Sequence, residues 1–190
     1  MKKLMIALAA VAMAVATQAA TYNWTWSVSG TGLIETPGTS GATDLASGTA
    51  YLFANLSASQ LSTIVSDFAD GKYTASGYEQ TSSVADGAIT KVNWNDSRSS
   101  GTSVDWTMIV TASVNGDDYL FISDALTKSR QADGKNTKVT FSVYDSSSAA
   151  TMQASGGYAG AGWYTAVPEP TSGLLMLLGM AGLALKRKRA

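Results

Sequence analysis

Residues 104–122 read VDWTMIVTASVNGDDYLFI, and this stretch decides the fold class. Apolar and polar residues alternate from Val104 to Val114, with only Ile109 interrupting the polar face, and this period of two is typical of a half-buried β-strand. Asn115-Gly116 follows, a pair that adopts positive φ angles readily and favours a β-hairpin. We therefore expect a hairpin whose loop runs through Asp117-Asp118 before a second strand begins.

The same alternation predicts further strands in other parts of the chain. It is clear at Tyr22–Val28 and Lys138–Val143, and it is weaker at Thr49–Ala54 and Ala88–Trp94. Three tryptophans share a strand face with aliphatic side chains and are therefore expected in the core: Trp24, Trp26 and Trp106.

One helix is predicted between Ser57 and Asp70. Its apolar residues have the i, i+3, i+4, i+7 spacing of a single helical face: Leu61, Ile64, Val65 and Phe68. Ser57 and Gln60 have the spacing of a capping box, and Gly71 can adopt the left-handed conformation that ends a helix. We expect the apolar face of this helix to cover an open edge or end of the sheets.

Together these elements predict an all-β fold for residues 21–144. We expect an antiparallel β-sandwich of jelly-roll or immunoglobulin-like size, with roughly seven or eight strands and one short amphipathic helix. Residues 145–162 are nearly all small, so 145–166 is expected to be a Gly/Ser/Ala-rich linker, with a short strand around Trp163 and Tyr164 as the alternative.

The composition excludes several classes of function. The sequence contains no cysteine and no histidine, which excludes Ser-His-Asp and Cys-His nucleophiles and nearly every zinc or copper site. A glycosidase would need two carboxyl groups about 5–9 Å apart, but the spacing of residues such as Glu35 and Glu79 selects no pair. We therefore expect that the protein is not an enzyme, and we keep a carboxylate-only glycosidase as an alternative.

The charge balance argues against a nucleic-acid partner. Six of the 13 basic residues lie in the two ends and one of the 14 acidic residues lies in the C-terminal end, so residues 21–166 carry 7 basic and 13 acidic residues. Nucleic acids and anionic lipid surfaces both demand clustered cations. We therefore expect neither a nucleic-acid partner nor binding to an anionic lipid surface.

Two groups of residues are candidate ligand contacts. Four oxygen-bearing side chains bracket one loop and are a candidate calcium site: Asn93, Asn95, Asp96 and Asp105. They do not follow the EF-hand order, so we expect turn-forming residues and no cofactor. The sequence pattern does not clearly assign three aromatic side chains to the core, so they are candidate sugar-binding residues: Trp94, Trp163 and Tyr164.

The first 20 residues have the features of a secretory signal peptide. Lys2 and Lys3 precede an uncharged apolar core from Leu4 to Ala16, and small residues follow. This core is shorter than the ~20 residues that a membrane-spanning helix needs, so we expect a signal helix that is cleaved after Ala19 or Ala20. The protein is therefore expected to be exported.

Residues 167–190 contain three features in a fixed order. Pro168-Glu169-Pro170 comes first, and its prolines keep the chain extended and open to an enzyme. The apolar run from Ser172 to Leu185 follows as a transmembrane-like helix, roughly 21 Å long against a hydrocarbon core of ~30 Å, which favours a temporary stop. The cations of Lys186-Arg187-Lys188-Arg189 then stay on the cytoplasmic side of the membrane.

This combination of motif, apolar helix and basic end resembles the PEP-CTERM sorting signal. The resemblance covers only residues 167–190. It implies a Gram-negative host that makes exopolysaccharide, and processing near the Pro-Glu-Pro motif by exosortase, a multi-spanning membrane enzyme. The protein is then expected at the cell surface or outside the cell after transient anchoring in the inner membrane. A plain single-pass C-terminal anchor is the alternative.

These features predict an exported cell-surface or extracellular-matrix protein. Its expected role is non-catalytic, either structural or associated with the exopolysaccharide of a biofilm matrix. A carbohydrate-binding or adhesive module is the alternative, and exposed aromatic side chains would favour it. The sequence selects neither a ligand nor an oligomeric state.

Overall fold

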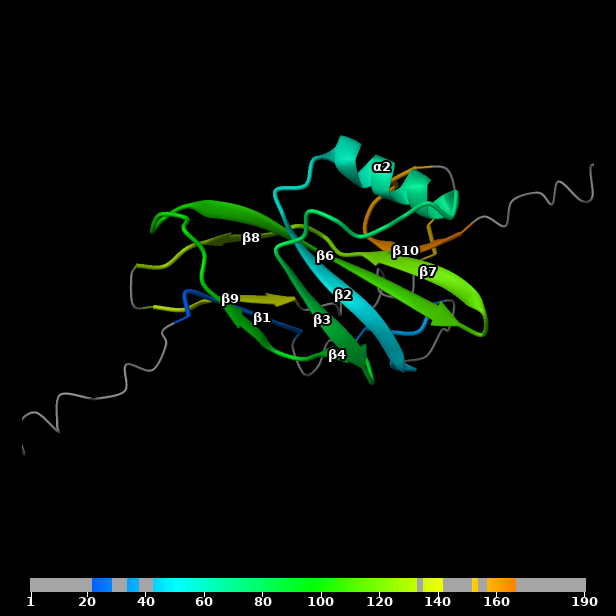
Figure 1. Ribbon diagram of the computed structural model, residues 1–190, viewed down its shortest axis with the longest axis horizontal. Helices are drawn as coiled ribbons and strands as arrows, with labels where there is room; N and C mark the ends of the chain where they lie inside the picture. Colours follow the sequence, from blue (N-terminus) through cyan, green and yellow to red (C-terminus); the bar gives the residue numbers. More distant parts are fainter. Residues whose placement is uncertain are drawn as a thin grey trace, which may run out of the picture.

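The computed structural model describes residues 22–28, 34–37, 43–132, 135–141, 152–153 and 157–166. In this part of the chain, two β-sheets pack face to face and a helix lies on the other face of the larger sheet (Figure 1). The larger sheet runs in the order β10 (Gly162–Thr165), β7 (Asp117–Ile122), β6 (Ser103–Val114), β2 (Ser47–Ala54), β3 (Gln80–Ala85) and β4 (Ala88–Ile89), with β8 (Leu126–Ser129) also paired to β6. The smaller sheet runs in the order β5 (Val92–Trp94), β1 (Trp24–Val28) and β9 (Thr137–Phe141).

The prediction of a purely antiparallel sandwich is wrong for the smaller sheet. Strands β1 and β9 pair in parallel, from Trp24 opposite Thr137 to Val28 opposite Phe141. Parallel neighbours need a long crossover, and more than a hundred residues separate these two strands in sequence, so the chain can return in the same direction. The named strand pairs of the larger sheet are antiparallel, as expected.

The larger sheet is buried on both faces, which gives the molecule three layers. The alternation along β6 sends Trp106, Met108 and Val110 into the core between the two sheets. Ile109 points the other way and packs under the helix, fully buried. The single residue that interrupts the polar face in the sequence is therefore the anchor for the third layer.

The helix α2 (Ala58–Ala69) forms as the local signals predict. Ser57 caps it, and the capping box is complete because Gln60 N–H donates to the Ser57 hydroxyl while the Ser57 N–H donates to the Gln60 side chain. Gly71 has a φ of 68° just after the helix. Leu61, Val65 and Phe68 pack against one face of the larger sheet, so the prediction that the helix covers an open edge or end is wrong.

The hairpin between β6 and β7 is tighter than expected. Val114 pairs with Asp117, which leaves Asn115 and Gly116 as the whole loop, with φ angles of 55° and 93°. Asp117 and Asp118 are residues of β7 and do not belong to the loop. The prediction of a longer loop was therefore wrong, because the Asn-Gly pair is sufficient to reverse the chain.

Other strands differ from their predicted limits. The stretch 88–94 divides into β4 and β5, which belong to different sheets, while β3 and β8 were not predicted. The predicted signal helix (1–20) and transmembrane-like helix (172–185) lie outside the residues that the structure describes. In the described part, none of the helices is long and apolar enough to cross a membrane.

Candidate functional site

The three predicted sugar-binding aromatic residues lie in the core. Trp94 is 7 % exposed, Trp163 is 0 % exposed and Tyr164 is 2 % exposed. A surface platform made of these residues is therefore excluded, because a ring must face solvent to stack on a sugar. The prediction failed because the burial of a side chain on a short strand depends on which strands pair with it, and the sequence alone does not identify those strands.

Trp94 belongs to a buried tryptophan cluster between the two sheets. Its ring stacks on Trp24 at 6.0 Å and meets the edge of Trp106 at 5.6 Å. The indole N–H groups of these three residues have no hydrogen-bond acceptor among the described residues. Ring packing and burial therefore hold this cluster, as expected for Trp24 and Trp106.

Trp163 and Tyr164 lie on β10, at one edge of the larger sheet. Trp163 faces the core between the sheets, 5.2 Å from the ring of Phe121. Tyr164 faces the helix layer, where its hydroxyl donates to the Gly160 carbonyl at 2.6 Å. Because β10 pairs with β7 over residues 162–165, the linker prediction is wrong for this part of 145–166, and the short strand is present.

The charged residues near the tryptophan cluster are already paired with one another. Arg98 donates to the carboxylates of Glu79 and Asp96, and its guanidinium lies 5.4 Å from the centre of the Trp106 ring. Burial alone would lower the pKa of Arg98, but hydrogen bonds to the two carboxylates and their charges outweigh it and raise that pKa. The carboxylates of Glu79 and Asp96 are therefore both bound to the guanidinium of Arg98, which lies between them.

The candidate calcium ligands do not form one cage. Asn93 accepts from the Thr25 hydroxyl at 2.7 Å, Asn95 accepts from the backbone of Asn23 at 2.7 Å, and Asp105 accepts from Thr127 at 2.5 Å. Asp96 is paired with Arg98. Within the described ranges, no group of three or more acidic side chains could hold a metal ion.

The structure reveals a different aromatic site, which the sequence analysis missed. Two cavities of about 370 Å³ and about 590 Å³ open on the helix side of the larger sheet. The segment 72–79, which crosses the sheet from α2 to β3, separates them, and Tyr73 and Thr74 line both (Figure 1). We call the two cavities together the tyrosine groove, defined by Thr49, Tyr51, Phe53, Tyr73, Thr111 and Asp118.

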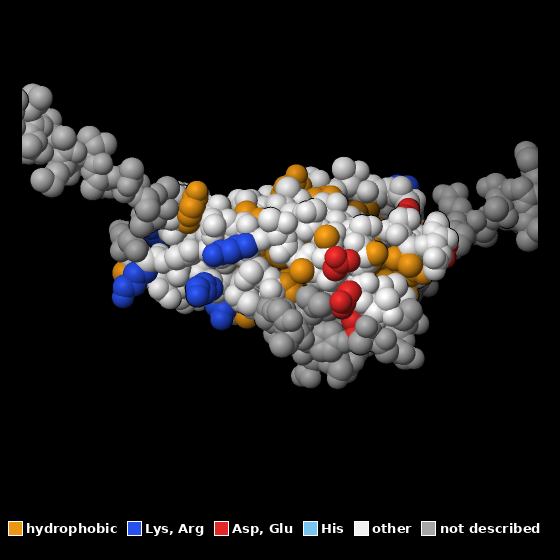
Figure 2. All heavy atoms as spheres, turned by 90° about the horizontal axis from the view of Figure 1, so that it is seen from below, with side chains coloured by type: hydrophobic (Ala, Val, Ile, Leu, Met, Phe, Trp, Pro, Cys, Tyr) orange, Lys and Arg blue, Asp and Glu red, His pale blue; other side chains and the backbone are white. Residues whose placement is uncertain are grey.

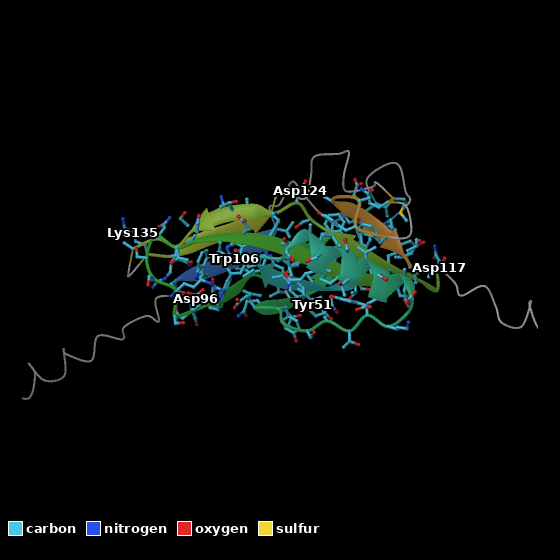
Figure 3. The ribbon with its side chains drawn as sticks, turned by 90° about the horizontal axis from the view of Figure 1, so that it is seen from above. Tyr51, Asp96, Trp106, Asp117, Asp124 and Lys135 are labelled. Atoms are coloured by element: carbon cyan, nitrogen blue, oxygen red, sulfur yellow. The ribbon has the colours of Figure 1, made fainter. Side chains whose placement is uncertain are left out.

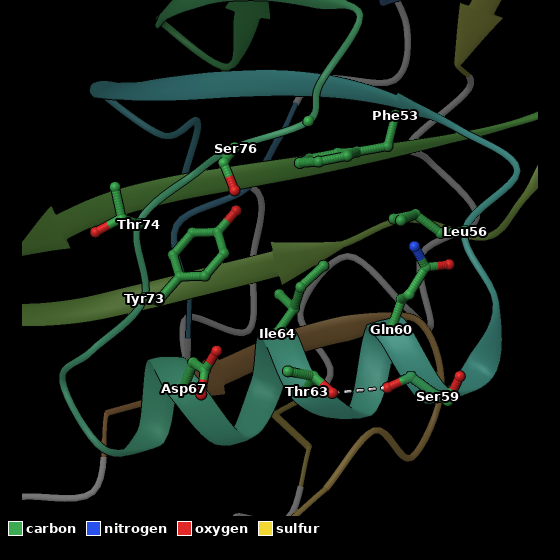
Figure 4. A pocket seen from close by; sticks show the side chains of 11 residues that line it. Phe53, Leu56, Ser59, Gln60, Thr63, Ile64, Asp67, Tyr73, Thr74 and Ser76 are labelled. Atoms are coloured by element: carbon green, nitrogen blue, oxygen red, sulfur yellow. Dashed lines mark hydrogen bonds between the residues drawn. The ribbon is translucent and has the colours of Figure 1, made fainter.

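The smaller cavity has an apolar floor and a polar rim. Phe53, Ile64 and Tyr73 point toward one another in the space between α2 and the strands (Figure 4). Burial raises the pKa of the Tyr73 phenol to about 12, and the neighbouring Tyr51 adds to this shift. The Tyr73 hydroxyl is buried and has no hydrogen-bond partner among the residues described.

The C-terminal end of the folded body lies beside this groove. The backbone N–H of Ala166 donates to the carbonyl of Asp118 at 3.4 Å, and Asp118 lines the larger cavity. Pro168 follows only two residues later in the sequence. Only Ala166 and Val167 therefore separate the end of β10 from the Pro-Glu-Pro segment in the sequence.

A protein-family model describes this same segment. The model of the PEP-CTERM protein-sorting motif matches residues 166–189. The chain carries a PEP-CTERM sorting motif. The match includes the predicted sorting residues, Pro168-Glu169-Pro170, and the predicted membrane stop, Lys186-Arg187-Lys188-Arg189, all of which lie outside the described residues.

The PEP-CTERM motif indicates a protein that exosortase, a membrane protease, sorts to the cell surface or the extracellular space. Neither the comparison with curated proteins nor the comparison with solved structures gives a match.

Proposed function

We propose that this protein is a non-catalytic component of the cell surface or extracellular matrix, associated with exopolysaccharide. The observation that carries the proposal is the PEP-CTERM motif, which directs the folded β-domain out of the cell. A hydrophobic tail and basic end hold the chain in the inner membrane until exosortase acts near Pro168-Glu169-Pro170. The β-domain is then the part that remains outside.

The state of the carboxylates supports a non-catalytic role. Glu79 and Asp96 are one acidic pair that the fold brings together, and both are bound to Arg98. Glu35 is buried and lies opposite Asp44 in an isolated β-bridge, so Glu35 and Glu79 do not form a pair with each other. A glycosidase needs one carboxylic acid to hold a proton and the other to act as base or nucleophile across a sugar. Here both carboxylates accept hydrogen bonds from the same guanidinium, so neither is free to act on a sugar.

A carbohydrate-binding or adhesive module is the second candidate. The tyrosine groove favours it, since concave sites with aromatic walls and a few polar groups are typical of ligand binding. Its two volumes lie within the roughly 300–1,000 Å³ range of ligand pockets.

Fractionation of the producing cells tests the proposal. The wild-type domain should co-purify with extracted exopolysaccharide, while a chain that ends at Ala166 should reach the periplasm or medium without being processed by exosortase. The control is a chain with Tyr22→Ala, an exposed position far from the tail in sequence. Recovery of the wild-type protein only from the cytosol would contradict the proposal.

A further inference from the structure

Aromatic rings are accessible along the tyrosine groove. Tyr78 lines neither cavity, but it is 40 % exposed and its ring packs beside the groove, 5.1 Å from Tyr51 and 6.3 Å from Phe53. Tyr51 and Tyr73 are half-buried, so their rings are fixed but still reachable. Such tyrosines present a large amphipathic surface with little loss of side-chain entropy on binding, which suits the apolar face of a sugar ring.

Hydroxyl groups cover the strands beside these rings. Thr49 of β2 pairs with Thr111 of β6 on one side and with Ser83 of β3 on the other. Along β6, Ser113 lies opposite Asp118 of β7. Each hydroxyl can donate and accept, and this versatility matches the hydroxyl groups of a glycan. The groove therefore combines stacking surfaces with adaptable hydrogen-bonding groups.

The charges around the groove select the kind of glycan. Its lining includes the carboxylates of Asp67 and Asp118, and none of the residues described as lining either cavity is Lys or Arg. Lys72, which precedes Tyr73, is paired with Asp70 at 2.9 Å. Figure 3 places Lys135 and Asp117 at opposite ends of the molecule, and on the face away from the helix Figure 2 shows most Lys and Arg toward one end and most Asp and Glu toward the other. An acidic polymer would therefore meet repulsion in the groove.

We propose that the tyrosine groove binds a glycan strand without acidic groups, either neutral or amine-bearing. The sugar rings stack on Tyr51 and Tyr78, their hydroxyls bond to Thr49 and Thr111, and Asp118 accepts from a hydroxyl or an amine. This inference rests on the proposed association with exopolysaccharide and names the site and the ligand class.

Affinity electrophoresis of the full-length chain, in detergent, tests the inference. The probes are dextran and mannan as neutral glycans, chitosan as an amine-bearing glycan, and alginate as a polyuronate. Wild-type protein should be retarded by at least one of the first three and not by alginate. Tyr78→Ala should raise the dissociation constant about tenfold or more, as expected for the loss of one stacked ring.

The matched control is Tyr22→Ala. Tyr22 is 42 % exposed, and Tyr→Ala leaves the net charge at neutral pH unchanged at both positions. Tyr73→Phe, which keeps the ring and deletes only the hydroxyl, should weaken binding less than Tyr78→Ala. Equal thermal midpoints for wild type and Tyr78→Ala show that the fold is intact.

Three results would overturn the inference: no retardation by dextran, mannan or chitosan, retardation by alginate alone, or the same affinity in Tyr78→Ala as in Tyr22→Ala. A change of oligomeric state in Tyr78→Ala without a change in glycan affinity would assign the groove to a second copy of the chain and also overturn it. If the surface protein still co-purified with exopolysaccharide after Tyr78→Ala, the proposed function would stand while this site would be wrong.

Discussion

Replacing Trp163 by alanine should strongly destabilise the domain. Trp163 is 0 % exposed and packs 5.2 Å from Phe121 and 6.2 Å from Tyr119, on a strand of only four residues. Truncating a buried tryptophan costs about 3–5 kcal/mol. Since a domain is stable by only about 5–15 kcal/mol, Trp163→Ala should remove a large part of that free energy.

The assay is thermal and urea unfolding of the chain 21–166, followed by circular dichroism. For a domain of this size, 1 kcal/mol shifts the midpoint by roughly 2–4 °C, so a fall of about 6–20 °C is expected. Tyr22→Ala is the control and should change the free energy of unfolding by less than about 0.5 kcal/mol. A midpoint for Trp163→Ala within 2 °C of the wild type, a shift below about 1 kcal/mol, would refute the burial of β10.

Three further changes follow from the structure. Ser57→Ala removes the helix cap and should lower the free energy of unfolding by about 1 kcal/mol in urea titrations, whereas no loss would show that the capping box is not formed. Gly48→Ala places a Cβ 2.8 Å from the carbonyl oxygen of Thr111 and should destabilise the β2–β6 pair by about 1–3 kcal/mol; a neutral or stabilising effect would contradict that register. The pKa of Tyr73 is raised from 10.0 to about 12, so the folded chain keeps a proton that the unfolded chain has lost; this stabilisation is complete below pH 10 and is lost toward pH 12. Wild-type stability should therefore fall more steeply than that of Tyr73→Phe over this range, and parallel curves would exclude the burial of the phenol.

Local signals in the sequence predicted the elements that local physics determines. The capping box and the apolar spacing located α2 within a residue at each end, and the Asn-Gly pair located the β6–β7 reversal. The burial of Trp24, Trp26 and Trp106 followed from the period of two. Each of these features depends on residues that are near one another in the sequence.

Features that depend on distant partners could not be predicted. Strand β10 has four residues in a small-residue context, and only its pairing with β7 buries Trp163 and Tyr164. Likewise, β1 and β9 pair across more than a hundred residues, so no local pattern shows that they are parallel.

The tyrosine groove was missed for the same reason. Tyr51 occupies a polar-face position of β2, and Tyr73 and Tyr78 lie in a segment without regular structure, so neither region stood out. The segment 72–79 folds back over the sheet and brings them together. The sequence does contain three tyrosines within 28 residues, Tyr51, Tyr73 and Tyr78, but their spacing alone does not show that they share one face.

The most direct test of the central claim is the intact mass of the protein recovered from the cell surface or medium. The account predicts a chain that begins after residue 19 or 20 and ends near Pro168-Glu169-Pro170, with the apolar run and the four cations removed. A surface-exposed chain whose mass includes residues 172–190 would contradict sorting by exosortase at the PEP-CTERM motif.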